Sequence, residues 1–136
     1  MEKSKMELIK EFIEKCPLLK KGKVNVDYIK DKPQSYSIDE TPAPTVLNRF
    51  IDGGTRNQIL FDFSIQANFS VLENIKNSKF CDDFTKWIKE QNDIGNLPEI
   101  DNVEKIECTA RGTILQTTET TAIYVIPMKV IYIEEF

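Results

Sequence analysis

The feature that most constrains the fold is a strict alternation of apolar and polar residues within Arg56–Ser70. Every odd position from Ile59 to Phe69 is apolar, and the even positions between them are polar apart from Leu60. Because side chains alternate between the two faces of a β-strand, this pattern predicts a strand with one buried face. It is far longer than the usual strand of about five or six residues. We therefore expect it to form the centre of an antiparallel sheet with one face on the core and the other in water.

Length and composition predict a single globular domain, residues 1–136. The chain is 40% hydrophobic and 29% charged, as in a soluble protein, and it is long enough to bury a core. No apolar run approaches the roughly 20 residues of a membrane span, and the charged N-terminus does not resemble a signal peptide. The sequence predicts a protein without membrane contact, made and kept in the cytoplasm unless an assembly carries it out.

The residue types that are missing restrict the chemistry. The chain has no histidine, which excludes His-based acid–base catalysis, Ser-His-Asp and Cys-His nucleophiles and His-ligated zinc. Cys16, Cys81 and Cys108 are widely spaced and form no CxxC pair, so we expect buried free thiols. A net charge of −4 argues against a dedicated nucleic-acid binder. We therefore expect no enzyme activity, no catalytic residues, no metal and no cofactor.

The segment before the long strand predicts a helix and three short strands. Ser4–Glu7 has the pattern of a capping box, and apolar residues follow at helical spacing up to Cys16, before Pro17 ends the helix. Two short strands, Val24–Tyr28 and Tyr36–Ile38, are predicted on either side of a proline-containing turn. A third strand, residues 46–51, turns through an Asp-Gly-Gly sequence into the long strand, which predicts a hairpin.

Two helices are predicted after the long strand. Ser70–Glu73 has the pattern of a second capping box and opens a short helix, which Asn77 and Ser78 interrupt. A second helix then carries an apolar stripe, and Gly95 and Pro98 end it. The stripe consists of Phe80, Phe84, Trp87 and Ile88. Aromatic residues at this spacing are far more often the face laid on a sheet than a ligand site.

The last third of the chain predicts a C-terminal β-hairpin, in which a strand over residues 105–114 is followed by a turn at Thr117–Thr120 and a strand at Thr121–Ile133. Both faces of this last strand are largely apolar. A strand covered on both faces is usually central, whereas Pro127 favours an edge or a bulge. An edge strand with a second apolar face favours self-association. The subunit interface predicted on this ground consists of Ile123, Val125, Pro127, Lys129, Ile131 and Ile133.

Together these elements predict an α+β fold: a mainly antiparallel sheet with an N-terminal helix, two helices inserted after the long central strand, and a C-terminal β-hairpin. Other charged motifs have simpler interpretations than a site. Asp82-Asp83 and Glu134-Glu135 are neighbours in sequence whose side chains diverge, so a solvated face or a helix cap is favoured. The Asp-Gly-Gly turn leads into a strand rather than a helix, unlike a phosphate-binding loop.

One basic cluster leaves two interpretations open. Lys20, Lys21 and Lys23 lie close together, with Lys15 just before them. A solubilising loop is favoured, and a DNA-facing contact with a nucleic-acid backbone is the minority interpretation.

Five segments carry a resemblance to a known family: CPLLKKGKVNVDYI, KPQSYSID, FIDGGTRNQILFDFSI, NSKFCDDFTKWIKEQNDIGNLPEI and TTETTAIYVI. Their most specific parts are the junction of the Asp-Gly-Gly turn with the long strand and a run of aromatic and amide residues that ends in Gly-Asn-Leu-Pro. None is a catalytic signature. On these segments, which extend in order over nearly the whole chain, the sequence resembles the tail-terminator or minor capsid proteins of tailed phages and prophages of low-GC Gram-positive bacteria.

The resemblance implies a virion structural protein, made in the host cytoplasm and located at the tail end near the neck. It implies a ring of copies, usually a homohexamer, on the last ring of tail-tube protein. Such a ring stops tube growth and presents a docking face to the head connector, adaptor or collar protein. In a mature phage, DNA crosses the lumen transiently.

Four other functions are weighed against this one. The first is a head-completion or connector-adaptor protein of the same particle, and the second is the terminator cap of a phage-tail-like bacteriocin. The third, from a different class, is a small acyl or phosphoryl transferase, which the absence of histidine and of a phosphate-binding loop disfavours. The fourth, a regulatory DNA-binding role, is weaker still, because the chain is acidic and has no recognition-helix pattern.

Overall fold

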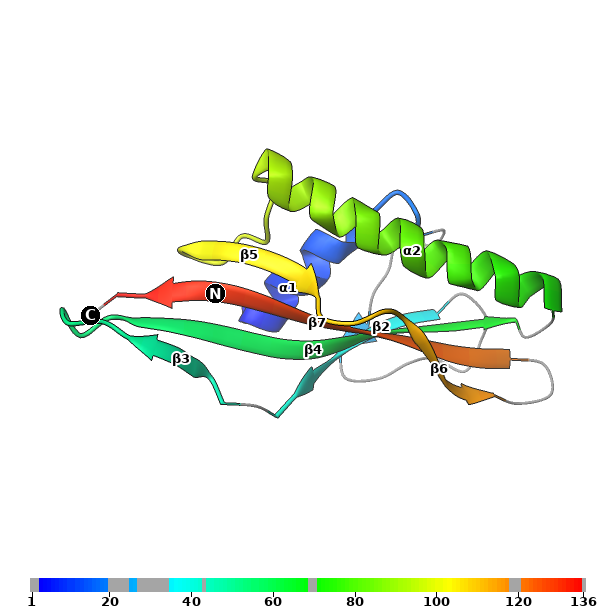
Figure 1. Cartoon of the computed structure of the whole chain (residues 1–136), viewed down its shortest axis with the longest axis horizontal. Coiled ribbons are helices and arrows are strands. Elements are labelled where there is room, and N and C mark those ends of the chain that lie inside the picture. Colours follow the sequence, from blue (N-terminus) through cyan, green and yellow to red (C-terminus); the bar gives the residue numbers. More distant parts are fainter. Residues whose placement is uncertain are drawn as a thin grey trace.

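A computed structural model describes residues 3–19, 25–26, 35–42, 44–68, 71–117 and 121–135. In this part of the chain seven strands form one sheet, and two helices pack on it (Figure 1). The elements in chain order are α1 (Lys5–Glu14), β1 (Asn25–Val26), β2 (Ser35–Thr41), β3 (Val46–Arg49), β4 (Thr55–Asn68), α2 (Val71–Ile94), β5 (Val103–Cys108), β6 (Thr113–Thr117) and β7 (Thr121–Glu134). The predicted class, α+β with a mainly antiparallel sheet, is confirmed.

The long central strand is also confirmed. β4 pairs with β7 along its whole length, from Thr55 opposite Glu134 to Asn68 opposite Thr121. On the other side of β4, β2 pairs with one end of the strand and β3 with the other. β5 and β6 divide the free side of β7 in the same way. Each long strand therefore has a partner on both sides, and the pair runs through the middle of the sheet.

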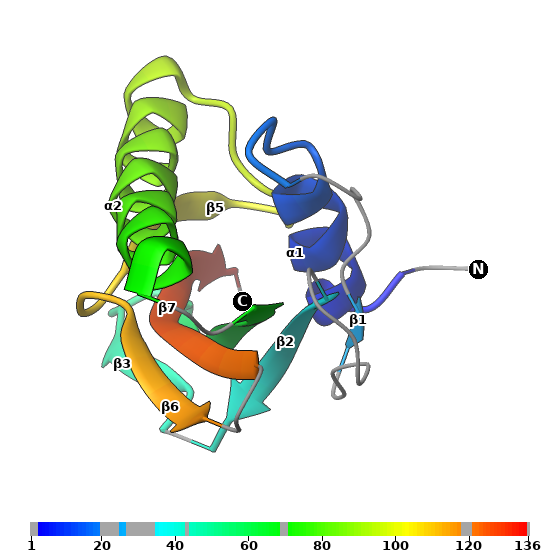
Figure 2. The same ribbon diagram turned by 90° about the vertical axis from the view of Figure 1, so that its right-hand side faces the viewer.

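Both helices lie on the same face of the sheet (Figure 2). The odd residues of β4 point to this face, and Phe61 and Phe63 are at most 1% exposed there. The ring centroid of Phe63 lies 4.8 Å from that of Phe84 in α2. Trp87 links α2 to α1, since its ring centroid lies 5.3 Å from that of Phe12. Aromatic contacts of this kind add stability beyond the buried area, so they fix the two helices against one face.

The ends of α1 are as predicted. The Ser4 hydroxyl accepts a hydrogen bond from the Glu7 backbone N–H at 3.2 Å, so one free amide of the first turn is satisfied. The helix ends at Glu14, three residues before Pro17. Among the cysteines, Cys16 and Cys81 are buried, Cys108 is half-buried, and all three are free thiols. Burial raises the pKa of Cys81 to about 11, so this thiol is protonated at neutral pH.

The prediction of two helices after β4 is wrong, because α2 is one continuous helix from Val71 to Ile94. Asn and Ser inside a helix cost only about half a kcal/mol each, and the buried residues Phe84 and Ile88 on the sheet side of α2 outweigh that cost. The predicted end is correct. Gly95 has φ +76°, and the Asn96 N–H donates to the Gln91 carbonyl at 2.9 Å, as in a Schellman motif.

Of the positions that the sequence leaves open for the last strand, central or at an edge, the structure shows the central one, so the edge on which self-association was predicted is absent. The strand predicted over residues 105–114 is split into β5 and β6, and both pair with β7, which is therefore internal. Pro127 lies opposite the interruption, where its carbonyl accepts from the Thr109 N–H at 2.8 Å. A residue's N and O point to the same side of a strand, so the missing N–H of Pro127 faces the interrupted ladder. The interruption explains how an internal strand tolerates proline.

Two further details of the sheet differ from the prediction. β1 pairs with β2 in parallel, with Asn25 opposite Ser37, rather than as two strands joined by a turn. The residues that connect them lie outside the described part of the chain, as do residues 118–120 of the predicted C-terminal hairpin. β6 and β7 are antiparallel neighbours, as that hairpin requires.

The outer edge of β5 is closed by a side chain of α2. The Asn92 carboxamide donates to the Ile106 carbonyl at 2.5 Å and accepts from the Ile106 N–H at 3.1 Å. It therefore takes the place of the backbone of a neighbouring strand. Because an open edge invites pairing with another chain, this contact protects the sheet at β5.

We predict that Asn92→Ala lowers the free energy of unfolding by about 1–3 kcal/mol, since it leaves the backbone N–H and C=O of the buried Ile106 without partners. Urea denaturation measures the change. Asp93→Ala, at the exposed neighbouring position, is the control and should change stability by less than about 0.5 kcal/mol. Equal effects of the two substitutions would show that the Asn92 contact contributes nothing.

Candidate assembly surfaces

The face of the sheet opposite the helices carries the predicted interface residues. Ile123, Val125, Pro127, Lys129, Ile131 and Ile133 all lie on β7 with their side chains on this outer face. Their cross-strand partners are even residues of β4, from Gln66 opposite Ile123 to Arg56 opposite Ile133. Neither of the two described helices packs on this face (Figure 2). The second apolar face predicted for the last strand is therefore the face of β7 that points away from the two helices.

These six residues differ in how much surface they present. Ile131 is only 3% exposed, whereas the other five are half-buried. Gln58 and Lys105 stand on either side of Ile131 in the ladder. Ile131 therefore belongs to the interior of the single subunit, and the remaining five residues stay a predicted contact surface.

The outer face is partly closed by the shape of the sheet. Figure 2 shows β6 and β2 curling on either side of β7. Ser37 and Ser64, polar residues on this face, are only 1% and 7% exposed. Burial raises the pKa of the Asp62 carboxyl, which lies between Asp39 and Pro127 in the ladder. The centre of this face therefore disfavours the charged form of a carboxylate.

Lys129, the charged member of the predicted set, already has a partner. Its Nζ lies 3.0 Å from Oε1 of Glu107, and Nζ of Lys105 lies 3.6 Å from the other oxygen of the same carboxylate. Partial burial opposes ionisation of Glu107, but the two ammonium groups outweigh it and hold the pKa of Glu107 below its usual value. Lys129 thus binds a neighbouring strand of its own sheet.

A second surface lies at the turn between β3 and β4, and sequence reasoning missed it. The large apolar residues Val46, Leu47 and Phe50 are 37–42% exposed, and Ile51 is fully exposed. In the sequence these residues form two adjacent pairs, 46–47 and 50–51, and do not alternate with polar residues. This pattern could have marked them as exposed. Four of the six exposed large apolar residues of the described chain thus lie within six positions.

This turn is held in place by its own hydrogen bonds. The Phe50 N–H donates to the Gly54 carbonyl at 2.8 Å, and the Asp52 carboxylate accepts from the Gly54 N–H at 3.0 Å. Gly53 has φ +94°, a conformation that glycine adopts without strain. The predicted Asp-Gly-Gly hairpin is confirmed. Because the turn is fixed, Phe50 and Ile51 are held in exposed positions next to the exposed Val46 and Leu47 of β3, and we call this segment, Val46–Ile51, the apolar turn.

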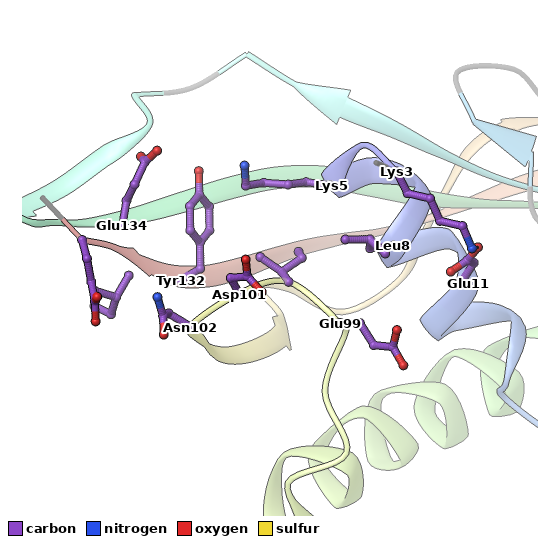
Figure 3. A pocket seen from close by; sticks show the side chains of 12 residues that line it. Lys3, Lys5, Leu8, Glu11, Glu99, Asp101, Asn102, Tyr132 and Glu134 are labelled. Atoms are coloured by element: carbon purple, nitrogen blue, oxygen red, sulfur yellow. The ribbon is translucent and has the colours of Figure 1, made fainter. Parts of the chain in front are cut away.

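A hollow of about 640 Å³ lies between α1, the segment before β5 and the end of β7 (Figure 3). Lys5 extends over the Tyr132 ring with its Nζ 5.2 Å from the centroid, and Lys3 pairs with Glu11. The hollow is lined by Lys3, Lys5, Leu8, Glu11, Glu99, Ile100, Asp101, Asn102, Tyr132, Ile133, Glu134 and Glu135. With five carboxylates against two ammonium groups, this acidic hollow favours cations.

A smaller depression of about 400 Å³ lies between α2 and the connection from β5 to β6. Lys86, Lys89 and Arg111 line it together with one carboxylate, Asp82. Nη2 of Arg111 lies 3.6 Å from Oδ1 of Asp82, and the Arg111 side chain is 88% exposed. We call Lys86, Lys89 and Arg111 the basic patch.

The structure shows where most of the other candidate motifs lie. Asp82 pairs with Arg111, and Glu134 and Glu135 line the acidic hollow. Lys20, Lys21 and Lys23 lie outside the described residues. Within the described residues, no group of three or more His, Cys, Asp or Glu side chains is arranged to hold a metal ion. Neither of the two helices in the described part of the chain is long and apolar enough to cross a membrane.

Comparison with known proteins adds no family. No protein-family model matches the sequence, and a search of curated proteins finds no match to it.

The different burial of Val125 and Ile131 gives a direct test of which residues can serve in contacts. We predict that Ile131→Asp lowers the free energy of unfolding by about 3–5 kcal/mol, because it removes a buried apolar side chain and puts a carboxylate in its place, away from water. Val125→Glu, at a half-buried position, should cost about 1 kcal/mol. Urea denaturation of both variants measures the difference. Equal losses would place Val125 in the interior as well.

Asp62 gives a prediction about pH. A raised pKa means that the folded protein binds the proton more tightly than the unfolded chain does, so this stabilisation is present below the usual value of 3.8 and is lost as the pH rises through the folded-state pKa. Asp62→Asn should therefore stabilise the protein at pH 7, and the gain should disappear near pH 3. Thermal denaturation across this range measures it, and a gain that grows toward acid pH would contradict the prediction.

Proposed function

We propose that this chain is a virion structural protein, a tail terminator that assembles as a ring on the end of a tail tube. Three observations support the proposal. The sequence resembles that family over nearly its whole length, the fold is the α+β sheet with helices that the resemblance implies, and the chain exposes a rigid apolar turn. Exposed apolar residues that are gathered in one place mark contact surfaces more often than scattered ones do.

The apolar turn is the observation that carries the proposal. Burying one large apolar side chain contributes about 1.5–3 kcal/mol, so Phe50 and Ile51 together suffice to anchor a contact. Their backbone is fixed by the turn hydrogen bonds, so little conformational entropy is lost on binding. We assign this surface to the contact with the last ring of tail-tube protein.

The mechanism is steric and needs no cofactor. A tube grows because each ring offers the next ring a matching surface. A terminator binds that surface on one side and presents an unlike surface on the other, which stops polymerisation and receives the head connector. Contacts between copies in the ring are heterologous, so each copy contributes two different surfaces.

Light scattering with and without the tail-tube protein tests the proposal. We expect the wild-type chain to reach the mass of a ring at least in the presence of the tube protein. A chain that stays monomeric in both conditions would overturn the assignment.

A pair of serine variants tests the role of the apolar turn. Phe50→Ser with Ile51→Ser should weaken binding to the tube protein at least tenfold, because the removed side chains account for more than about 1.4 kcal/mol. Ile94→Ser is a suitable control, because Ile94 is 72% exposed on α2 and outside the turn. Unchanged binding by the turn variant would assign the tube contact to another surface.

A further inference from the structure

Two surfaces of opposite charge lie on different parts of the subunit. The acidic hollow is formed beside α1 and the end of β7, and the basic patch is formed by α2 and the connection from β5 to β6. In Figure 2, α1 lies over the right-hand part of the sheet, and the connection from β5 to β6 lies at the left edge of the molecule. One copy can therefore present both surfaces to two different neighbours.

The charges on both surfaces are largely uncompensated within the subunit. Glu99, Asp101 and Glu135 are exposed and form no ion pair with any described residue. In the described part of the chain, Lys86 and Lys89 likewise have no ion-pair partner. Clusters of like charge repel one another, so each surface gains from a partner of the opposite sign.

The shapes of the two surfaces are compatible. The hollow, at about 640 Å³, is large enough for the end of an arginine side chain. Arg111 is 88% exposed, and its contact with Asp82 is a long one, at 3.6 Å. An arginine guanidinium binds carboxylates through paired hydrogen bonds, so it is suited to a site that holds several of them.

We propose that the acidic hollow of one copy binds the basic patch of the next copy, with Arg111 entering the hollow toward Glu99 and Asp101. The contact is heterologous, because unlike surfaces meet, and such contacts close into a ring when the rotation between copies permits it. This inference rests on the proposed ring and names the contact between its subunits. Charge complementarity supplies orientation and a fast association rate.

Charge reversal tests the contact. The patch variant, Lys86→Glu with Arg111→Glu, has two acidic surfaces, and the hollow variant, Glu99→Lys with Asp101→Lys, has two basic surfaces. Each variant alone should associate at least tenfold more weakly than the wild type, by sedimentation velocity at low salt. Mixed in equal amounts, they should recover association to within about threefold of the wild type, because every contact then joins opposite charges. The variant with all four reversals should recover it alone.

Three further measurements make the result specific. Lys15→Glu with Lys79→Glu changes the net charge as the patch variant does, at exposed residues that line neither surface, and should associate like the wild type. Circular dichroism of each variant establishes that it is folded. Raising the salt concentration should weaken wild-type association, because ions screen surface charges.

The outcomes separate this inference from the proposed function. Single-surface variants that associate like the wild type would overturn the inference and leave the ring intact. Variants that are folded and fail both alone and in the mixture would also overturn it, since the charges would then not pair with each other. If neither the wild type nor the mixture associates, even with tail-tube protein present, both proposals are wrong.

Discussion

The rest of the structure depends on the antiparallel pairing of β4 with β7. Thr55 to Asn68 are all in register with Glu134 to Thr121, so two strands far apart in sequence form one continuous ladder. A shift by one residue would turn Phe61 and Phe63 away from the core, which makes this register strongly specified. Every other strand attaches to this pair or to a strand beside it, and both helices pack on the face that it presents.

Because both helices pack on one face of the sheet, the two faces of the sheet are covered to different extents. The contacts from Phe12 through Trp87 and Phe84 to Phe63 join both helices and the sheet on one side. On the other side the described residues provide only the curl of the sheet as a cover, and polar residues such as Ser64 are buried there. The Asp62 carboxyl, opposite Asp39 in the ladder, is partly buried there, and this burial disfavours its charged form. Functional contacts are therefore expected around this core rather than inside it.

Sequence patterns predicted what local periodicity controls. The alternation in β4, the Ser4 cap and the turn through Gly53 follow from neighbouring residues, and all three are confirmed. Sequence patterns gave wrong or incomplete predictions where tertiary packing determines the local structure. Packing on the sheet outweighs the weak helix propensity of Asn77 and Ser78, and the place of Pro127 depends on an interruption in a different strand. The acidic hollow was not predictable, because its carboxylates come from distant segments that only the topology brings together.

The treatment of the sheet edges indicates how copies of this chain can meet. Asn92 occupies the backbone groups of Ile106 in β5, and β3 is only four residues long, has an irregular register and ends in Arg49. Short strands, bulges and charges all discourage strand addition. Because strand addition is discouraged at the edges formed by β5 and β3, association of copies at these two edges must depend on contacts between side chains. Side-chain surfaces fix one orientation between two partners, whereas an open edge pairs with any extended chain, and the proposed ring requires a fixed orientation.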